Sequence, residues 1–226
     1  DGFGGVDTFT DIEEIRGSNF ADTLTGSGGD ERFITRQGND YVDGGAGFDT
    51  VRYDQSGAGP VHVDLGAQMA TGTWYGQAFT DTLINIEAVR GSSGNDTLIG
   101  DNNSNELNGK AGDDNINTGN NVGGIVGYDY VQGHTGNDTI TFGQGQGYFI
   151  VDYNWFGGTS IAVNLTLGSG QVDKGADGVD TLVGLSTISR EQDGIEIRGT
   201  GGNDTFIGSN DPGLNYVAFQ GMGGDD

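Results

Sequence analysis

A nine-residue pattern recurs through most of the chain and constrains its fold more than any other feature. Residues 44–52 (GGAGFDTVR) show glycine at positions one, two and four, aspartate at position six and a large apolar residue at position eight. The glycines allow a sharp turn, Asp49 supplies a carboxylate at its end, and Val51 lies at the centre of a short strand and faces inward. Because one such unit cannot bury its own apolar side chain, the units are expected to stack.

Copies of the pattern follow one another without gaps in two blocks. The units are 2–10, 17–25, 26–34, 35–43, 44–52, 76–84, 91–99, 100–108, 109–117, 124–132, 133–141, 142–150, 175–183, 199–207, a loose one at 212–220 and an incomplete one at 221–226. In a chain that is only 33% hydrophobic, the eighth position is large and apolar in every complete unit: Phe9, Leu24, Phe33, Val42, Val51, Leu83, Leu98, Leu107, Ile116, Val131, Ile140, Phe149, Leu182, Phe206 and Phe219. The pattern therefore predicts a solenoid with one apolar stripe per row of units.

The sixth position places acidic residues in columns. Two nonapeptides make one coil of a flattened solenoid, so equivalent positions are 18 residues apart in sequence and about 4.8 Å apart in space. The predicted pairs are Asp22 with Asp40, Glu31 with Asp49 and Asp96 with Asp114. Allowing for six inserted residues at 118–123 and at 11–16, Asp114 also pairs with Asp138, Asn105 with Asp129, and Asp7 with Glu31. Two such carboxylates repel by roughly 3 kcal/mol at an effective dielectric of 20, so the columns need a cation between coils.

Calcium is the ion that this arrangement favours. It takes six to eight oxygen ligands in flexible geometry, and glycine-rich turns offer carbonyl oxygens beside each carboxylate. Magnesium needs a tight octahedron and fits less well. Spacing, ligand type and turn chemistry agree, so we predict calcium binding rather than a metal-free acidic solenoid.

Composition limits the other classes of function. The net charge of −24 excludes a nucleic-acid backbone or an anionic membrane as a simple electrostatic partner. The chain has no cysteine, so neither disulfides nor zinc or redox chemistry is indicated, and no apolar segment is long enough to span a membrane. No signal peptide is visible at the start. Both ends fall inside repeats, so we expect a part of a longer protein, flanked by further repeats.

The nonapeptide blocks resemble the RTX, or hemolysin-type, calcium-binding repeat family closely, and the remaining segments resemble it more loosely. The resemblance implies an all-β fold, a right-handed parallel β-roll or β-solenoid with several calcium ions between successive turns, type I secretion, and folding outside the cell. In that family the motif aspartates of adjacent coils and nearby turn carbonyls hold each ion. The expected ligands are therefore Asp7, Asp22, Gly26, Gly28, Glu31, Asp40, Gly44, Ala46, Asp49, Asp96, Asn105, Gly109, Ala111, Asp114, Asp129, Gly133, Thr135, Asp138, Asp204 and Asp226.

The chain divides into five predicted sections. Residues 1–52, 91–150 and 199–226 are calcium-binding β-roll blocks, the last of them truncated, and 53–90 and 151–198 are wider coils that continue the solenoid without calcium, the second with an insertion. Val61, Val63 and Leu65 alternate with polar residues as in half-buried strands, and so do Ile161, Val163 and Leu165. The aromatic residues Trp74, Tyr75, Trp155 and Phe156 are expected to be local core, or else a stacking surface for sugar or a protein partner.

Catalysis finds no support among the motifs. The two histidines, His62 and His134, belong to no H-E-x-x-H sequence, and neither G-x-S-x-G nor a phosphate-binding loop is present. We therefore predict a non-enzymatic, calcium-binding structural region of a large secreted or cell-surface bacterial protein. The alternative is an accessory module of a secreted enzyme, such as a polyuronate epimerase, that binds extracellular polysaccharide.

Overall fold

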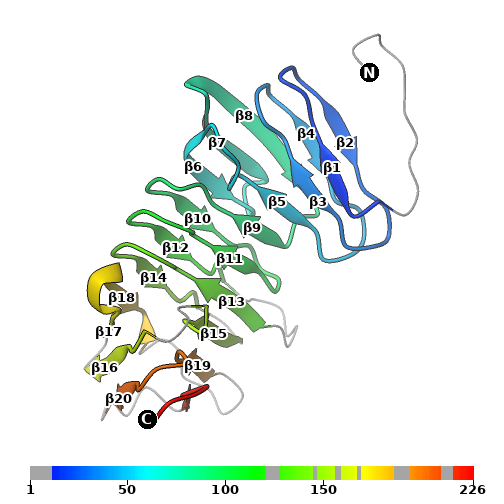
Figure 1. Cartoon of the computed structure of the whole chain (residues 1–226). Helices are drawn as coiled ribbons and strands as arrows, with labels where there is room; N and C mark the ends of the chain where they lie inside the picture. Colours follow the sequence, from blue (N-terminus) through cyan, green and yellow to red (C-terminus); the bar gives the residue numbers. More distant parts are fainter. Residues whose placement is uncertain are drawn as a thin grey trace.

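The computed structural model describes residues 12–120, 128–144, 147–155, 159–166, 169–185, 194–209 and 216–226. Over these residues the chain forms short strands that stack along one axis, with one 3₁₀ turn, η1 (Gly175–Asp177) (Figure 1). The predicted residues Asp7, Phe9 and Phe156 lie outside the described part. The strands form two sheets that face each other across the stack.

The first sheet has nine strands and is parallel throughout. In spatial order its strands are β1 (Glu14–Arg16), β3 (Arg32–Ile34), β5 (Thr50–Arg52), β9 (Ala88–Arg90), β11 (Glu106–Asn108), β13 (Tyr128–Gln132), β15 (Tyr148–Asp152), β19 (Gly194–Arg198) and β21 (Val217–Gln220). Within the nonapeptide blocks, each strand covers the seventh to ninth positions of a unit, as β5 does in 44–52.

The second sheet has twelve strands and contains two antiparallel interruptions. Its strands are, in spatial order, β2 (Thr23–Thr25), β4 (Tyr41–Asp43), β8 (Gln77–Ile84), β7 (Met69–Trp74), β6 (Ala58–Asp64), β10 (Thr97–Ile99), β12 (Asn115–Asn117), β14 (Thr139–Thr141), β18 (Val179–Val183), β17 (Ser169–Asp173), β16 (Ala162–Thr166) and β20 (Thr205–Ile207). Successive nonapeptides alternate between the two sheets, so the predicted parallel β-roll is confirmed.

The register matches the repeat spacing. Leu24 lies opposite Val42 and Leu98 opposite Ile116, each pair 18 residues apart. Ile116 lies opposite Ile140, and this larger separation absorbs the six residues inserted at 118–123. The strand pairing therefore follows the nonapeptide frame through both blocks.

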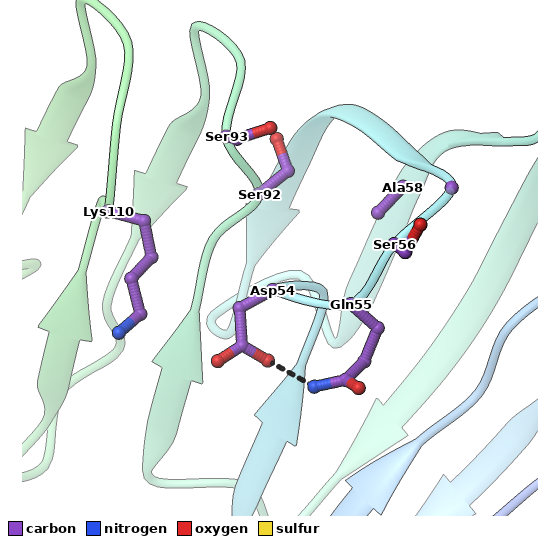
Figure 2. Close-up of a pocket in the computed structure, with 8 residues that line it drawn as sticks. Asp54, Gln55, Ser56, Ala58, Ser92, Ser93 and Lys110 are labelled. Carbon is purple, nitrogen blue, oxygen red and sulfur yellow. Dashed lines mark hydrogen bonds between the residues drawn. The ribbon is translucent and has the colours of Figure 1, made fainter.

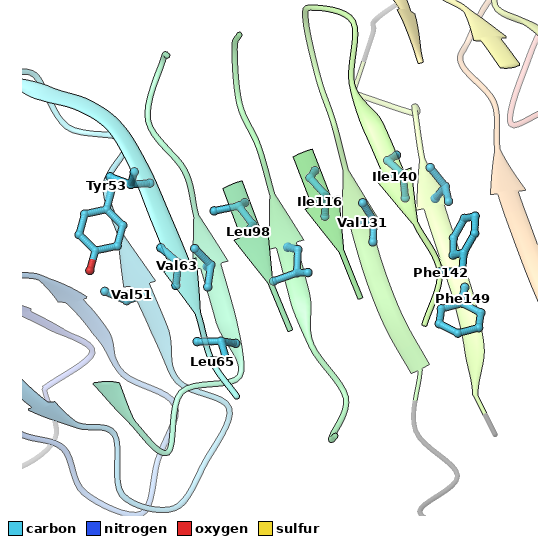
Figure 3. Close-up of a cluster of buried hydrophobic side chains, with 14 of the residues drawn as sticks. Val51, Tyr53, Val63, Leu65, Leu98, Ile116, Val131, Ile140, Phe142 and Phe149 are labelled. Carbon is cyan, nitrogen blue, oxygen red and sulfur yellow. The ribbon is translucent and has the colours of Figure 1, made fainter. Parts of the chain in front are cut away.

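The core is built around the stripe of eighth-position side chains, which other apolar residues such as Tyr53, Val63 and Phe142 extend between the sheets (Figure 3). Leu98, Ile116, Val131 and Ile140 are fully buried. Burying a side chain of this size stabilises a fold by about 1.5–3 kcal/mol, so the stack depends on each unit contributing one. Leu24, Phe206 and Phe219, which lie near the two ends of the described stack, are only partly buried.

The segments 53–90 and 151–198 differ from the wider coils that we expected. In each, three antiparallel strands are inserted into the twelve-stranded sheet, β8-β7-β6 and β18-β17-β16, while β5 pairs directly with β9 on the opposite sheet and β15 with β19. The chain reverses between β7 and β8 at Tyr75 and Gly76, both with positive φ, which is the geometry of a two-residue hairpin loop. Each meander therefore adds two strands to one side of the stack.

The alternating segments behave as predicted. Val61, Val63 and Leu65 are buried, as are Ile161, Val163 and Leu165. Trp74 is buried in the core and Trp155 packs against it, whereas Tyr75 is 68% exposed.

Candidate calcium-binding turns

The sixth-position residues of neighbouring coils are joined by a hydrogen bond that recurs along the stack. The backbone N–H of one residue donates to the carboxylate of its partner on the next coil, and we call each such pair a rung. The donor–acceptor distances are 2.8 Å for Asp22–Asp40, 2.7 Å for Glu31–Asp49, 2.8 Å for Asp96–Asp114, 2.9 Å for Asn105–Asp129, 3.0 Å for Asp114–Asp138 and 2.9 Å for Asp204–Asp226. The predicted pairs within the described residues are therefore brought together.

Two further rungs join the blocks to the meanders. Asp40 donates to Asp81 over 3.0 Å, and Asp138 donates to Asp180 over 3.0 Å. Asp81 and Asp180 occupy sixth positions of units 76–84 and 175–183, so their motif identified them, but they were left out of the expected ligands.

The turns fall into two classes according to the residue at the second position. In the closed turns this residue donates its N–H to the sixth-position side chain of its own unit, as Ser92 does to Asp96 over 2.6 Å. The Ser92 hydroxyl also donates to Asp96, over 2.9 Å. The closed turns are those of Asp22, Glu31, Asp96, Asn105 and Asp204. In these turns the protein itself supplies the partners of the sixth-position side chain.

In the described open turns the second residue has a positive φ, and its N–H makes no hydrogen bond to the carboxylate of its own unit. These residues are Arg36 (φ 73°), Gly45 (96°), Lys110 (75°), His134 (67°) and, in the incomplete last unit, Met222 (66°). The carboxylates of the first four units, Asp40, Asp49, Asp114 and Asp138, are buried, whereas Asp226 is exposed. The second residue therefore decides whether the turn closes on its carboxylate.

The open turns leave buried carboxylate oxygens without a hydrogen-bond partner. The Oδ2 atoms of Asp40, Asp49 and Asp114 are each buried and unpartnered. Burial raises the pKa of Asp40 to about 7, of Asp49 to about 6 and of Asp114 to about 8, from an ordinary value of 3.8. A buried charge without a partner is costly, so these oxygens mark places where the fold lacks positive charge.

Glycine at the first position brings oxygens from two coils together. A Cβ on Gly44 would lie 2.5 Å from Asp49 Oδ2 and 2.1 Å from the carbonyl oxygen of Asn85 on the next coil. A Cβ on Gly91 would lie 2.4 Å from Asp96 Oδ2 and 2.8 Å from the carbonyl oxygen of Gly109. Only glycine allows this approach of carboxylate and carbonyl. Hard oxygen donors from carboxylates and carbonyls are the set that calcium prefers, so the residues present fit that ion.

The expected carbonyl ligands occupy the same turns but differ in their surroundings. The Gly44 carbonyl lies beside Glu31 at the Cβ position of Gly26, and the Gly109 carbonyl lies beside Asp96. The carbonyl of Thr135 accepts a hydrogen bond from Gly112, and Thr135 forms a parallel bridge with Ala111. The other expected turn residues are Gly28, Ala46 and Gly133. Ala46 donates its N–H to Ser27, Gly28 has open space at its Cβ position, and Gly133 lies against Asp138.

Within the described part of the chain, no three acidic or histidine side chains converge on one point. The geometry explains this result, because each gap between coils is faced by two sixth-position side chains, and the oxygens beside them are backbone carbonyls such as those of Asn85 and Gly109.

The family comparison identifies the repeat. A model described as the RTX calcium-binding nonapeptide repeat matches residues 7–38, 16–51, 87–121, 126–149 and 196–211, which together cover just over half of the chain. The chain belongs to the RTX calcium-binding repeat family. It is thus a calcium-binding structural repeat region, and RTX-repeat proteins are typically secreted. No helix in the described residues is long and apolar enough to cross a membrane.

The other comparisons add little to this RTX assignment. The crystal structure of the extracellular lipase LipA from Serratia marcescens is similar at 19% identity, over 83% of this chain and 40% of the lipase, with a TM-score of 0.20. The chain thus spans less than half of that lipase, and a likeness of this size supports no inference about function. No curated protein matches the chain.

Sequence reasoning missed several residues that complete the rungs. Tyr53 and Tyr153 are fully buried, and their hydroxyls donate to Asp81 over 3.2 Å and to Asp180 over 2.8 Å. Tyr53 and Tyr153 stand in the similar sequences VRYD (51–54) and VDYN (151–154), but nothing in these sequences indicated a contact so distant along the chain. Lys174, fully buried beside Asp138 and Asp180, had no recognisable signal.

Proposed function

We propose that this RTX region is a folding module of a larger secreted or surface-attached bacterial protein, and that calcium drives its folding after export. The observation that carries the proposal is the set of buried, unpartnered Oδ2 atoms of Asp40, Asp49 and Asp114 in the open turns. Calcium bound there would supply positive charge between facing carboxylates and accept their oxygens as ligands. We assign the calcium sites first to these open turns.

The chain's own residues oppose folding when no cation is present. Keeping Asp114 protonated at pH 7, against its ordinary pKa of 3.8, costs about 4 kcal/mol of folding free energy. Protonation of Asp40 has a comparable cost. The 46 glycines add to the conformational entropy lost on folding. These costs are comparable to the stability of an ordinary domain, which is about 5–15 kcal/mol. This comparison supports the proposal that the chain stays unfolded in calcium-poor cytosol.

Calcium outside the cell shifts this balance toward the folded state. If each site binds at about 10⁻⁴–10⁻³ M, as extracellular modules do, a tenfold excess of ion adds about 1.4 kcal/mol per site. Each occupied site therefore adds to the stability of the folded state. An unfolded chain inside the cell is also suited to export through a type I system, which is the route that the RTX resemblance implies.

Far-ultraviolet circular dichroism during a calcium titration tests the proposal. We expect a cooperative, EGTA-reversible gain of β signal with a midpoint near about 10⁻⁴–10⁻³ M, and no equivalent gain with magnesium. The triple variant Asp40→Asn, Asp49→Asn, Asp114→Asn should lose most of the calcium response. The matched control is Asp30→Asn, Asp113→Asn, Asp225→Asn, which removes the same charge from exposed positions. Equal responses of the two triple variants would contradict the assignment to open turns.

A structural role also agrees with the surroundings of the two histidines. His62 lies half-buried within β6. His134 stacks on Trp155 with ring centroids 3.6 Å apart, and burial lowers its pKa to about 3. We therefore propose no catalytic activity for this region.

One observation favours the alternative, binding of an anionic polysaccharide. A hollow of about 460 Å³ lined by Asp54, Gln55, Ser56 and Lys110 (Figure 2) shares Gln55 and Ser56 with a second hollow of about 320 Å³. Arg16, Arg36 and the exposed Tyr75 line the second hollow. Three basic side chains beside an exposed aromatic ring are a concentration of positive charge in an acidic chain, and such rings can stack on sugars.

Affinity electrophoresis separates the two functions. The polysaccharide module would be established if uronate polymers slow the migration of the protein at saturating calcium. The double variant Arg36→Ala, Tyr75→Ala should lose this retardation, and Arg32→Ala should retain it. Identical mobility in uronate, neutral-glycan and blank gels would exclude it.

A further inference from the structure

Lys174 is a fully buried lysine that lies between two coils. It directly follows β17, and its side chain has no exposed surface. Its Nζ lies 3.0 Å from Asp138 Oδ2 and 2.5 Å from Asp180 Oδ1, and it donates to the His134 carbonyl over 2.5 Å. The ammonium therefore contacts two carboxylates of successive coils and one turn carbonyl.

These contacts match what an open turn offers a metal ion. Asp138 belongs to an open turn because His134 has a positive φ. In the open turns of Asp40, Asp49 and Asp114, the Oδ2 atom is buried without a hydrogen-bond partner. In the Asp138 turn the same atom is paired with the ammonium.

The backbone fixes the lysine in this place. Its N–H donates to the Gly178 carbonyl over 2.8 Å, and Gly136 donates to the Asp177 carbonyl over 2.8 Å. The η1 loop is thus hydrogen-bonded to the turn that carries Asp138. A buried ammonium is tolerated only when it is paired and hydrogen-bonded, and both conditions are met here.

The other meander provides an internal comparison. Asp40 and Asp81 form the same rung as Asp138 and Asp180, and a buried tyrosine hydroxyl caps each, Tyr53 and Tyr153 respectively. The residue that directly follows β7 is Tyr75, which is exposed, whereas the residue that directly follows β17 is the buried Lys174. The two junctions therefore share the rung and the tyrosine, and only the second has an ammonium.

We propose that the Lys174 ammonium is a tethered substitute for calcium at the Asp138–Asp180 rung. This inference rests on the proposed function, because it assigns calcium to the other open turns. The rung excludes calcium and stays joined when calcium is absent, whereas the Asp40–Asp81 rung requires the ion. The Asp138–Asp180 rung, joined by Lys174, is therefore the place from which calcium-driven folding can spread along the stack.

The test uses Lys174→Ala, which removes the ammonium and leaves room for an ion, and Lys174→Met, which removes the charge and keeps most of the volume. Arg32→Ala is the control, because it also removes one positive charge and Arg32 is exposed on β3, outside the turns. Calcium stoichiometry is measured by isothermal titration. We expect Lys174→Ala to bind one ion more than the wild type, while Lys174→Met and Arg32→Ala bind the wild-type number.

Amide hydrogen exchange locates the effect. Thr82 donates to the Asp40 carbonyl over 2.8 Å and Thr181 to the Asp138 carbonyl over 2.7 Å, so these two amides report on the matched rungs. In EGTA the wild type should exchange at least about tenfold more slowly at Thr181 than at Thr82. Lys174→Ala should abolish this difference, and calcium should restore protection at Thr181.

Each result has a defined meaning. Unchanged stoichiometry in Lys174→Ala, or loss of folding that calcium does not rescue, would overturn the substitution and leave an ordinary buried ion pair. Rescue of an unfolded Lys174→Ala chain by calcium alone would support it. If the wild type binds no calcium, the proposed function fails as well. In that case the wild type should still exchange more slowly at Thr181 than at Thr82, and Lys174→Met should lose this difference. That result would show that Lys174 joins the Asp138–Asp180 rung without metal.

Discussion

Replacing Asp114 by asparagine should have opposite effects with and without calcium. Asp114 is buried, lies between Asp96 and Asp138 in its column, and burial raises its pKa to about 8. In the absence of calcium at pH 7, the folded state must hold a proton that the unfolded state has released, which costs about 4 kcal/mol. The neutral amide avoids this cost, so Asp114→Asn should stabilise the calcium-free fold by about 2–4 kcal/mol.

The fold already accepts asparagine at this position of the repeat, because Asn105 keeps its rung to Asp129. Osmolyte-induced folding in EGTA, followed by circular dichroism, measures the calcium-free stability, and calcium midpoints measure the loss of a ligand. Asp113→Asn, an exposed neighbour, is the control and should change neither value appreciably. If Asp114→Asn is destabilised in EGTA, or binds calcium as tightly as the wild type, the attribution of an energetic penalty to this carboxylate is wrong.

Three other outcomes follow from the same geometry. The folded pKa values of the buried motif aspartates lie above their unfolded values, so the calcium-free fold should gain stability as the pH falls from about 8 to about 5 and lose it as the pH rises. Circular dichroism in EGTA measures this pH dependence, and a stability that does not change with pH would contradict it. Gly91→Ala, whose Cβ would meet Asp96 Oδ2 at 2.4 Å, should destabilise the calcium-bound fold by at least about 2 kcal/mol, whereas Gly208→Ala has open space and should not; equal urea midpoints would count against the first-position constraint. Ile116→Ala, in the fully buried stripe, should cost about 2–5 kcal/mol in calcium by thermal unfolding, and a loss below about 1 kcal/mol would contradict the shared core.

The repetitive part of the fold was predictable because the nonapeptide is a local code. Val51 faces the core because every unit places an apolar residue one step after the strand begins, and the spacing of Asp22 and Asp40 fixes their register. Such positions repeat with the chain, so neighbouring coils confirm one another. The same periodicity indicated which acids would face each other across the coils.

The antiparallel meanders and the buried Lys174 ion pairs could not be predicted in the same way. The alternation at Val61 and Val63 indicates a half-buried strand but not its antiparallel partner, because strand order depends on the reversal at Tyr75. A single lysine at position 174 is usually a solvated side chain. Its burial arises only when η1 is hydrogen-bonded to a turn forty residues earlier. The difference between open and closed turns depends on the backbone angle of the second residue, and Arg36 and Lys110 show that glycine is not required there.

The most direct measurement is anomalous diffraction from crystals of this RTX region grown in millimolar calcium. Peaks should lie at the open turns of Asp40, Asp49 and Asp114, against the carboxylate Oδ2 atoms, and no peak should lie between Asp138 and Asp180. Water alone at the open turns, or calcium only at exposed surface carboxylates, would contradict the claim that divalent cations join neighbouring coils through buried aspartates.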